Sequence, residues 1–222
     1  MVKAILSDGG NILFSDRGTK RAEYEKINKH IPQLSYEEFY AGFRKFKTMA
    51  QTLPNYNLDD GLRDYLTEIG HAEIYEIIKN EKSEKKGGQM ELIKNVKETL
   101  QKIHEAGVPF IILTDATKKG SELKPFLAKL GIEEYVTEMV SSKDVGVIKP
   151  DERFFATILE KYGLKKEEVV FIAHDDDELR GACNLGIPVI AFNYESTQDL
   201  SYIPEGQKIK DFSELETKIL KK

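Results

Sequence analysis

The chain has 222 residues, of which 40% are hydrophobic and 32% charged, a composition typical of a folded globular protein. Its net charge is -5, with acidic and basic residues interspersed, so the composition does not support nucleic-acid binding. One cysteine excludes a disulfide framework within the chain, and no apolar run approaches the ~18 residues of a membrane span; we expect a cytoplasmic protein with no membrane partner.

The first predicted element is a short buried strand at residues 2–6, an apolar run that contains valine and isoleucine. It leads into Asp8, Gly9 and Gly10, where two glycines permit a tight turn and close approach of a ligand to the backbone. Because ligands bind at the carboxyl ends of strands in open α/β sheets, Asp8 is a candidate functional carboxylate. The alternative is an aspartate that only caps a turn.

Residues 15–88 show helical patterns and no predicted strand. Ser35 and Glu38 form a capping box, and aromatic side chains follow at helical spacing up to residue 46. This aromatic stripe either packs a small helical core or lines a substrate pocket. Further predicted helices cover residues 18–30, 58–69 and 73–78. The charged run 80–88 ends in two glycines and is typical of a linker, so we expect an all-helical insert.

Beyond the insert, predicted strands and helices alternate. The predicted strands cover residues 108–113, 135–140, 169–173 and 187–192. The predicted helices cover residues 91–105, 119–130, 151–162 and 179–185, with a last helix capped by Ser213 and Glu216. Strands that alternate with helices indicate an α/β fold with a parallel sheet covered on both faces.

Polar residues gather where three of these strands end. Asp8 follows the first strand, Thr114 and Asp115 follow the second, and the acidic cluster 174–178 follows the fourth. A carboxylate can act as a nucleophile, and a hydroxyl with the Lys149 ammonium can hold the oxygens of an anion. Acidic side chains together with Asp8 can hold a hard cation. The sequence therefore predicts a site for a phosphoryl or similar anionic group.

These segments resemble the haloacid dehalogenase superfamily over essentially the whole chain. Asp8 in AILSDGGNIL matches the first motif, Thr114 in FIILTD the second and Lys149 in GVIKPDERFF the third. The segment EEVVFIAHDDDELRGACNLGIPVIAF falls where the fourth motif belongs. The resemblance implies a Rossmann-like parallel-sheet core with a helical cap inserted after the first motif. The corresponding ranges are 1–14 and 89–222 for the core domain and 15–88 for the cap domain.

The resemblance also implies roles for individual residues. Asp8 is the expected nucleophile, and it works with Thr114 and Lys149 as the catalytic set. The substrate anion is expected to contact Thr114, Asp115, Lys149, Gly9 and Gly10. A metal ion, Mg²⁺ or another divalent ion if any, is expected at Asp8, the Gly10 carbonyl, His174, Asp175 and Glu178.

Two positions depart from the family pattern. Gly10 stands where family phosphatases carry a second aspartate as general acid and base, a group whose loss typically costs about 10²–10⁴ in rate. His174 stands where a metal-binding carboxylate is expected, and imidazole suits Zn²⁺, Mn²⁺ or no metal better than Mg²⁺. Asp175 restores a carboxylate if the loop shifts by one residue, and Glu178 offers another.

Three functions are compatible with this sequence. The favoured hypothesis is a phosphatase of a small phosphorylated metabolite that works through an aspartyl-phosphate intermediate. The second is a metal-independent hydrolase of the haloacid dehalogenase type, in which Arg17, Arg21 or Arg44 holds the substrate carboxylate. The third is a catalytically impaired binding or regulatory protein on the same scaffold.

Overall fold

The computed structural model describes residues 2–15, 22–80 and 90–220. Residues 81–88 of the predicted linker, residues 18–21 of the first predicted helix, and Arg17 lie outside these described residues, as does Arg21; Asn80 ends a helix. Within them, no helix is long and apolar enough to cross a membrane.

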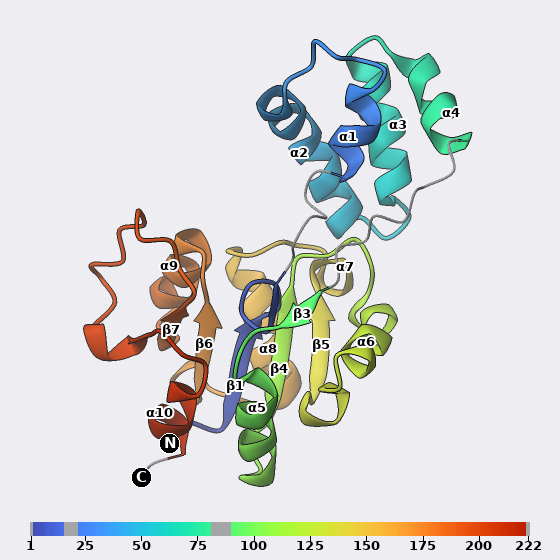
Figure 1. Cartoon of the computed structure of the whole chain (residues 1–222). Helices are drawn as coiled ribbons and strands as arrows, with labels where there is room; N and C mark the ends of the chain where they lie inside the picture. Colours follow the sequence, from blue (N-terminus) through green and yellow to red (C-terminus); the bar gives the residue numbers. More distant parts are fainter. Residues whose placement is uncertain (1, 16–21, 81–89, 221–222) are drawn as a thin grey trace.

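The centre of the molecule is a parallel sheet of six strands in the order β5-β4-β1-β6-β7-β8 (Figure 1). The strand carrying Asp8 is therefore central, paired with β4 on one side and β6 on the other. The six strands are β1 (Ala4–Asp8), β4 (Phe110–Thr114), β5 (Glu138–Ser141), β6 (Val169–Ala173), β7 (Val189–Phe192) and β8 (Lys208–Ile209). This arrangement confirms the predicted α/β class with a parallel sheet.

Along β1, β4, β5, β6 and β7, successive side chains belong alternately to two separate hydrophobic clusters, one on each face of the sheet. On β1, Ile5 belongs to one cluster, whereas Ala4 and Leu6 belong to the other. The first cluster packs against α5 (Val96–Glu105), α6 (Gly120–Lys129) and α10 (Glu214–Ile219). The second packs against α8 (Glu152–Tyr162) and α9 (Asp176–Asn184). Since both faces are buried, β1, β4, β6 and β7 consist mainly of apolar residues.

The helices that follow β1 form a separate unit with its own hydrophobic cluster, beyond the carboxyl ends of the strands (Figure 1). They are α1 (Ala22–Asn28), α2 (Tyr36–Thr52), α3 (Leu58–Glu68) and α4 (Ala72–Asn80). The aromatic stripe of α2 lies in this cluster, where Phe39, Phe43 and Phe46 surround the ring of Tyr65. These buried rings therefore form the core of the helical unit.

Local capping chemistry explains where several helices begin. The predicted box at α2 is confirmed, because the Ser35 hydroxyl accepts from the Glu38 N–H and Glu38 accepts from the Ser35 N–H. The predicted box at α10 is wrong. Ser213 has helical backbone angles, and its side chain makes no cap bond to the helix. It donates instead to Asp211, at 2.6 Å.

Three short strands and one short helix were not predicted. The edge strand β8 (Lys208–Ile209) pairs with β7, and the other two strands pair with each other. Phe14–Ser15 (β2) pairs antiparallel with Glu91–Leu92 (β3), so the predicted helix at 91–105 begins only at Val96. Ser15, the first residue of the predicted all-helical insert, accordingly belongs to a strand. Helix α7 (Ser142–Val145) follows β5 directly. Short 3₁₀ turns cover Glu133–Tyr135, Lys166–Glu168 and Glu205–Gln207.

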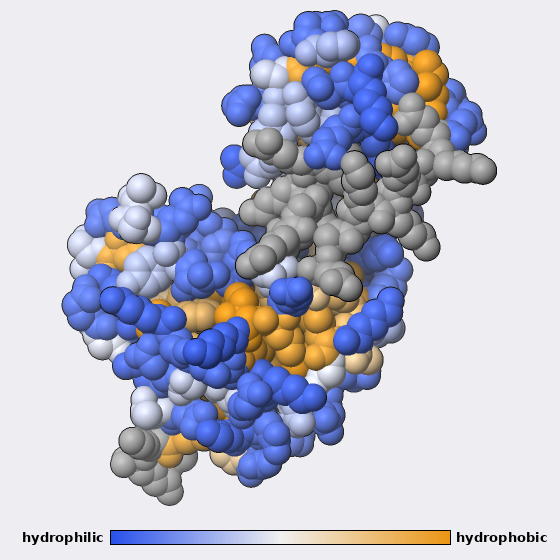
Figure 2. All heavy atoms as spheres, in the orientation of Figure 1, coloured by the Kyte–Doolittle hydropathy of each residue, from blue (hydrophilic) through white to orange (hydrophobic). Residues whose placement is uncertain are grey.

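On the face drawn in Figure 2, hydrophilic residues cover most of the helical unit and the periphery of the core, and an apolar area crosses the middle of the core. Comparison with Figure 1, drawn in the same orientation, shows that this apolar area lies over the sheet.

Candidate active site

Asp8 is the last residue of β1 and is almost completely buried, with 8% of its surface exposed. The chain turns sharply after it, because the Leu13 N–H donates to the Gly9 carbonyl and the Asn11 N–H donates to the Phe14 carbonyl. Asn11, with φ of 58°, supplies the left-handed residue of this turn. The predicted tight turn is thus confirmed, although neither glycine takes that conformation.

The two glycines differ in what surrounds them. A Cβ atom at Gly9 would lie 3.3 Å from a methyl group of Ile112, so the backbone approaches β4 closely at this position. Among the described residues, a Cβ atom at Gly10 would meet nothing within 4 Å. Gly10 therefore supplies no acid or base where a second aspartate would stand.

Lys149 is the direct partner of Asp8. Its ammonium Nζ lies 2.5 Å from Asp8 Oδ1, 3.1 Å from Glu178 Oε2 and 3.0 Å from the Leu113 carbonyl. The lysine side chain is 1% exposed, and those of Asp8 and Glu178 are 11% and 13% exposed. Three acceptors surround one ammonium, so this charge is fully partnered although it is out of water.

Burial and charge set the protonation states here. Burial lowers the pKa of Lys149, because it disfavours the charged form. The attraction of the Asp8 and Glu178 carboxylates is stronger than this effect and raises the pKa of the lysine overall. Burial raises the pKa of Glu178 to about 8, against the lowering effect of the Lys149 ammonium. Near neutral pH the group therefore holds the Lys149 ammonium and a Glu178 carboxyl that is mostly protonated.

A close contact between the loop before α8 and the helix α9 positions Lys149. Pro150, the next residue, packs against Gly181 of α9, where an added Cβ atom would lie 2.5 Å from the proline Cβ. Only glycine permits this approach, and it brings Lys149 to Glu178, one helical turn earlier on α9. The Lys149 N–H also donates to Asp115 Oδ1 at 3.2 Å.

The end of β4 supplies the other predicted anion-binding groups. Thr114 is half-buried, and among the described residues its hydroxyl makes no hydrogen bond, which leaves it available to a ligand. Burial raises the pKa of Asp115, against the opposing effect of Lys149. The Asp115 carbonyl accepts from Gln51 Nε2 of α2, at 3.0 Å. The helical unit thus touches the same loop that carries Thr114.

His174 lies beside Asp8 on the loop after β6. Its Nε2 is 3.7 Å from Asp8 Oδ2, its Nδ1 is 3.7 Å from Asp175 Oδ1, and its side chain is 18% exposed. The Asp175 side chain is 56% exposed and precedes the first turn of α9. The structure therefore brings His174, Lys149 and Glu178 to Asp8, but leaves Asp175 at the surface.

These side chains do not fit Mg²⁺ as they stand. In the described parts of the chain, no three His, Cys, Asp or Glu side chains are grouped so that they could hold a metal ion. Lys149 contacts both Asp8 and Glu178, and the His174 imidazole is a further neighbour of Asp8. Mg²⁺ requires several oxygen ligands in near-octahedral geometry. The donors expected from the sequence are thus near one another without forming a magnesium site.

Sequence reasoning missed the residues by which the helical unit meets the core. The ammonium of Lys143, on α7, contacts the carbonyl oxygens of Ala50, Leu53 and Tyr56 at the end of α2. Gln51 makes the contact to Asp115 described above. No local pattern points to either residue, because each partner is more than 60 positions away.

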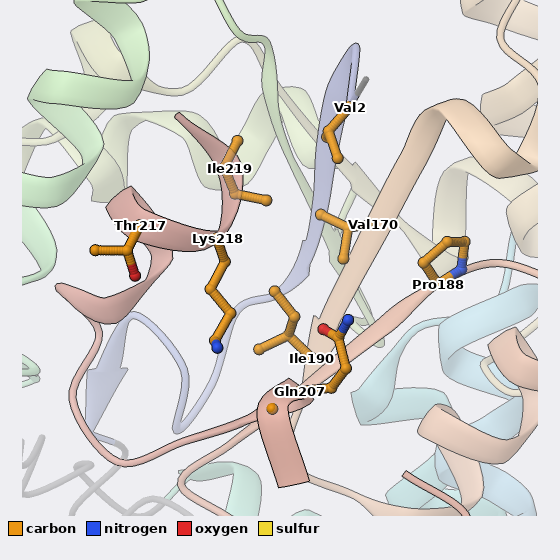
Figure 3. A pocket seen from close by; sticks show the side chains of 9 residues that line it. Val2, Val170, Pro188, Ile190, Gln207, Thr217, Lys218 and Ile219 are labelled. Atoms are coloured by element: carbon orange, nitrogen blue, oxygen red, sulfur yellow. The ribbon is translucent and has the colours of Figure 1, made fainter. Parts of the chain in front are cut away.

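A separate hollow opens at the opposite edge of the sheet. It is lined by Val2, Val170 and Ile190 together with Pro188, Gln207 and α10 residues such as Lys218 (Figure 3). Val2 precedes β1, and Val170 lies near the beginning of β6, so this hollow is at the amino ends of the strands. It is remote from Asp8, and we assign the functional site to the carboxyl edge.

Comparison with known proteins bears on the family and the fold of the chain. The model of the family described as haloacid dehalogenase-like hydrolase matches residues 21–192, which is more than half of the chain. A phosphoglycolate phosphatase of Pectobacterium atrosepticum is 31% identical over 103 residues, covering 46% of this chain and 43% of that protein. A ribulose-1,5-bisphosphate 5-phosphatase of Halopiger xanaduensis is 29% identical over 112 residues, covering 50% and 46%. The matches span less than half of these relatives.

Solved structures share the fold over nearly their whole length. A dehalogenase crystal structure superposes with a TM-score of 0.63 at 18% identity, covering 100% of this chain and 98% of that one. The structure of a predicted phosphoglycolate phosphatase from Haemophilus somnus gives a TM-score of 0.64 at 18% identity, covering 99% and 98%. At such identities the likeness shows the fold alone.

Proposed function

The chain belongs to the haloacid dehalogenase-like hydrolase family, and we propose that it is a phosphatase of small phosphorylated metabolites. The observation that supports this most directly is the buried contact of 2.5 Å between Asp8 and Lys149. An ammonium held against a carboxylate can stabilise an anionic transition state next to that carboxylate. The two curated relatives described above are phosphatases by name, which adds support for attack at phosphorus.

In the first step, Asp8 Oδ attacks phosphorus, a bond from Asp8 to phosphorus forms, and the bond to the leaving oxygen breaks. Lys149 stabilises the negative charge on the phosphoryl oxygens, and the Thr114 hydroxyl donates to one of them. In the second step, water attacks the aspartyl phosphate, which releases phosphate and regenerates Asp8. The backbone of Gly9 and Gly10 lies close enough to the nucleophile to contact the bound anion.

Both steps move a proton, and Gly10 has no side chain to carry it. We propose His174 for this role, because its Nε2 faces Asp8 Oδ2 at 3.7 Å and its ring is partly open to solvent. The nearby Asp175 carboxylate can orient the ring through Nδ1. In this scheme the protein's own groups carry the reaction, and no step depends on Mg²⁺.

We further propose that residues 15–88 act as a cap domain on a core of residues 1–14 and 89–222. Gln51 and Lys143 support this assignment, since both tie the end of α2 to loops around the site. The position of the helical unit beyond the carboxyl edge of the sheet is in keeping with a lid over Asp8 (Figure 1).

The test is hydrolysis of an aryl phosphate and of a panel of small phosphate monoesters by the wild type and by Asp8→Asn. Each assay is run with Mg²⁺, Mn²⁺, Zn²⁺ and with chelator, and circular dichroism confirms that the variant is folded. We expect turnover that persists in chelator and disappears in Asp8→Asn. Equal rates in both proteins, or no turnover under any condition, would contradict the proposal. A complete lack of turnover would favour a binding or regulatory role.

One observation favours a second candidate, hydrolysis at carbon with release of halide. Halide needs no proton to leave, so the missing side chain at Gly10 would cost nothing in the first step. Of the arginines predicted to hold a haloacid carboxylate, Arg44 is exposed on α2. Halide release from 2-chloropropionate, lost in Asp8→Asn and without any phosphatase activity, would establish this candidate over the first.

A further inference from the structure

The end of α2 presents one more charged group to the site. Gln51 Nε2 donates to the Asp115 carbonyl, which fixes the face of α2 that is turned toward the loop after β4. Lys47 stands four positions earlier on the same helix, and residues four apart lie on one helical face. Lys47 therefore lies one turn farther from the docked end of α2, on the face that looks toward the loop.

The charge environment agrees with this placement. The positive charge of Lys47 partly opposes the rise that burial causes in the pKa of Asp115, so its ammonium is within electrostatic reach of the Asp115 carboxyl. Lys47 is exposed, and among the described residues its ammonium has neither an ion pair nor a hydrogen bond. The other ammonium at the site, Lys149, is buried and fully partnered by Asp8, Glu178 and a carbonyl.

The docking of α2 is firm enough to position this charge. Lys143 binds three carbonyl oxygens at the end of α2, including that of Ala50 at 2.9 Å and that of Tyr56 at 2.6 Å. A cation is favourable at a helix carboxyl end, where the last carbonyl groups lack partners. Lys47 is therefore held on a helix whose end is fastened at two points beside the site.

We propose that Lys47 binds a second anionic group of the substrate. The substrate class is then a small phosphate monoester that also carries a carboxylate or a second phosphate group. This inference rests on the proposed phosphatase function: Asp8, Thr114 and Lys149 receive the reacting phosphoryl group, and Lys47 receives the other anion. Binding of that anion also neutralises the exposed ammonium that faces Asp115.

The test compares three substrates that differ at the end remote from the reacting phosphate. Ethyl phosphate has an uncharged methyl group where 2-phosphoglycolate has a carboxylate, and ribulose 1,5-bisphosphate has a second phosphate. We expect Lys47→Met to lower kcat/KM about ten- to a hundredfold for the substrates with two anionic groups, mainly through KM, since charge-assisted hydrogen bonds have that strength. For ethyl phosphate we expect no change, and we expect Lys47→Arg to retain most of the wild-type value.

The matched control is Lys45→Met, which removes the same charge from the same helix. Lys45 is paired with Glu68 of α3, at 2.5 Å, in an exposed ion pair within the helical unit. The Lys45→Met variant should leave unchanged the ratio of kcat/KM for substrates with two anionic groups to kcat/KM for ethyl phosphate. Equal losses for all substrates in Lys47→Met, or the same selective loss in Lys45→Met, would overturn the proposal.

Calorimetric binding separates this inference from the proposed chemistry. If the wild type hydrolyses no phosphate ester, the phosphatase proposal fails, while binding of 2-phosphoglycolate is still measurable against ethyl phosphate. Tighter binding of 2-phosphoglycolate that Lys47→Met abolishes would support the role of Lys47 alone. Binding that does not depend on Lys47 would overturn it.

Discussion

Glu178 provides a sharp test of the electrostatics of the site, because its carboxyl is buried beside Asp8 and Lys149. Burial raises its pKa from 4.5 to about 8, so the folded protein holds a proton that the unfolded chain releases near pH 4.5. The contribution of Glu178 to the free energy of unfolding is then fully present below about pH 4.5 and is lost as the pH rises to about 8. At about 1.36 kcal/mol per pKa unit, the difference between the two pKa values of Glu178 corresponds to at most about 5 kcal/mol in the free energy of unfolding.

The substitution Glu178→Gln keeps the shape of the side chain and removes its titration. We expect urea unfolding of the wild type to show a loss of about 2–5 kcal/mol, relative to the variant, between acidic and mildly alkaline pH. Circular dichroism at several pH values, with identical urea series for both proteins, gives this difference directly. Titrating groups that do not interact with Glu178 are shared by the two proteins and cancel; the measured difference therefore reports Glu178 together with its coupling to Lys149, Asp8 and Asp115. A difference that does not vary with pH, or a wild type that gains stability as the pH rises, would refute the reasoning.

Three further predictions concern the contacts around the site. Lys149→Met leaves Asp8 without its ammonium; unfolding in urea should show a loss of about 3–5 kcal/mol, and kinetics a kcat at least about 10²-fold lower. Gly181→Ala places a methyl group 2.5 Å from the Pro150 Cβ, so we expect a loss of about 1–3 kcal/mol in urea unfolding and a lower kcat. Lys143→Met removes the three carbonyl contacts at the end of α2, and urea unfolding should show a loss of about 1–3 kcal/mol. A free energy of unfolding equal to that of the wild type in any of these variants would contradict the stabilising role given to its contact.

Local patterns were sufficient for most of the core. The strand at 169–173 lies where it was predicted, because five consecutive apolar residues are buried on both faces of a parallel sheet. Asp8 and Thr114 also lie at strand ends as predicted, since a polar residue that ends an apolar run marks that end. The α9 helix begins three residues before its predicted start, because Asp176 and its acidic neighbours occupy the first turn and favour it.

Features that depend on distant partners could not be predicted. Glu91 and Leu92 become a strand only because Phe14 and Ser15 lie alongside them, and no pattern in either segment indicates the pairing. The contact between Gln51 and Asp115 joins residues 64 positions apart. The Lys149–Glu178 contact depends on the approach of Pro150 to Gly181, which requires the folded arrangement of α8 and α9.

The most direct test of the account is to trap the covalent intermediate on Asp8. The wild type is mixed with a substrate phosphate ester, quenched in acid within one turnover and digested, and the peptide that contains Asp8 is analysed by mass spectrometry. With an aryl phosphate, whose leaving group needs no acid, we predict a phosphoryl group on Asp8 that is absent in Asp8→Asn and accumulates in His174→Gln, where the second step lacks its base. Phosphate release without any phosphoryl group on Asp8 would mean that water attacks the substrate directly, and would contradict the assignment of Asp8 as the nucleophile.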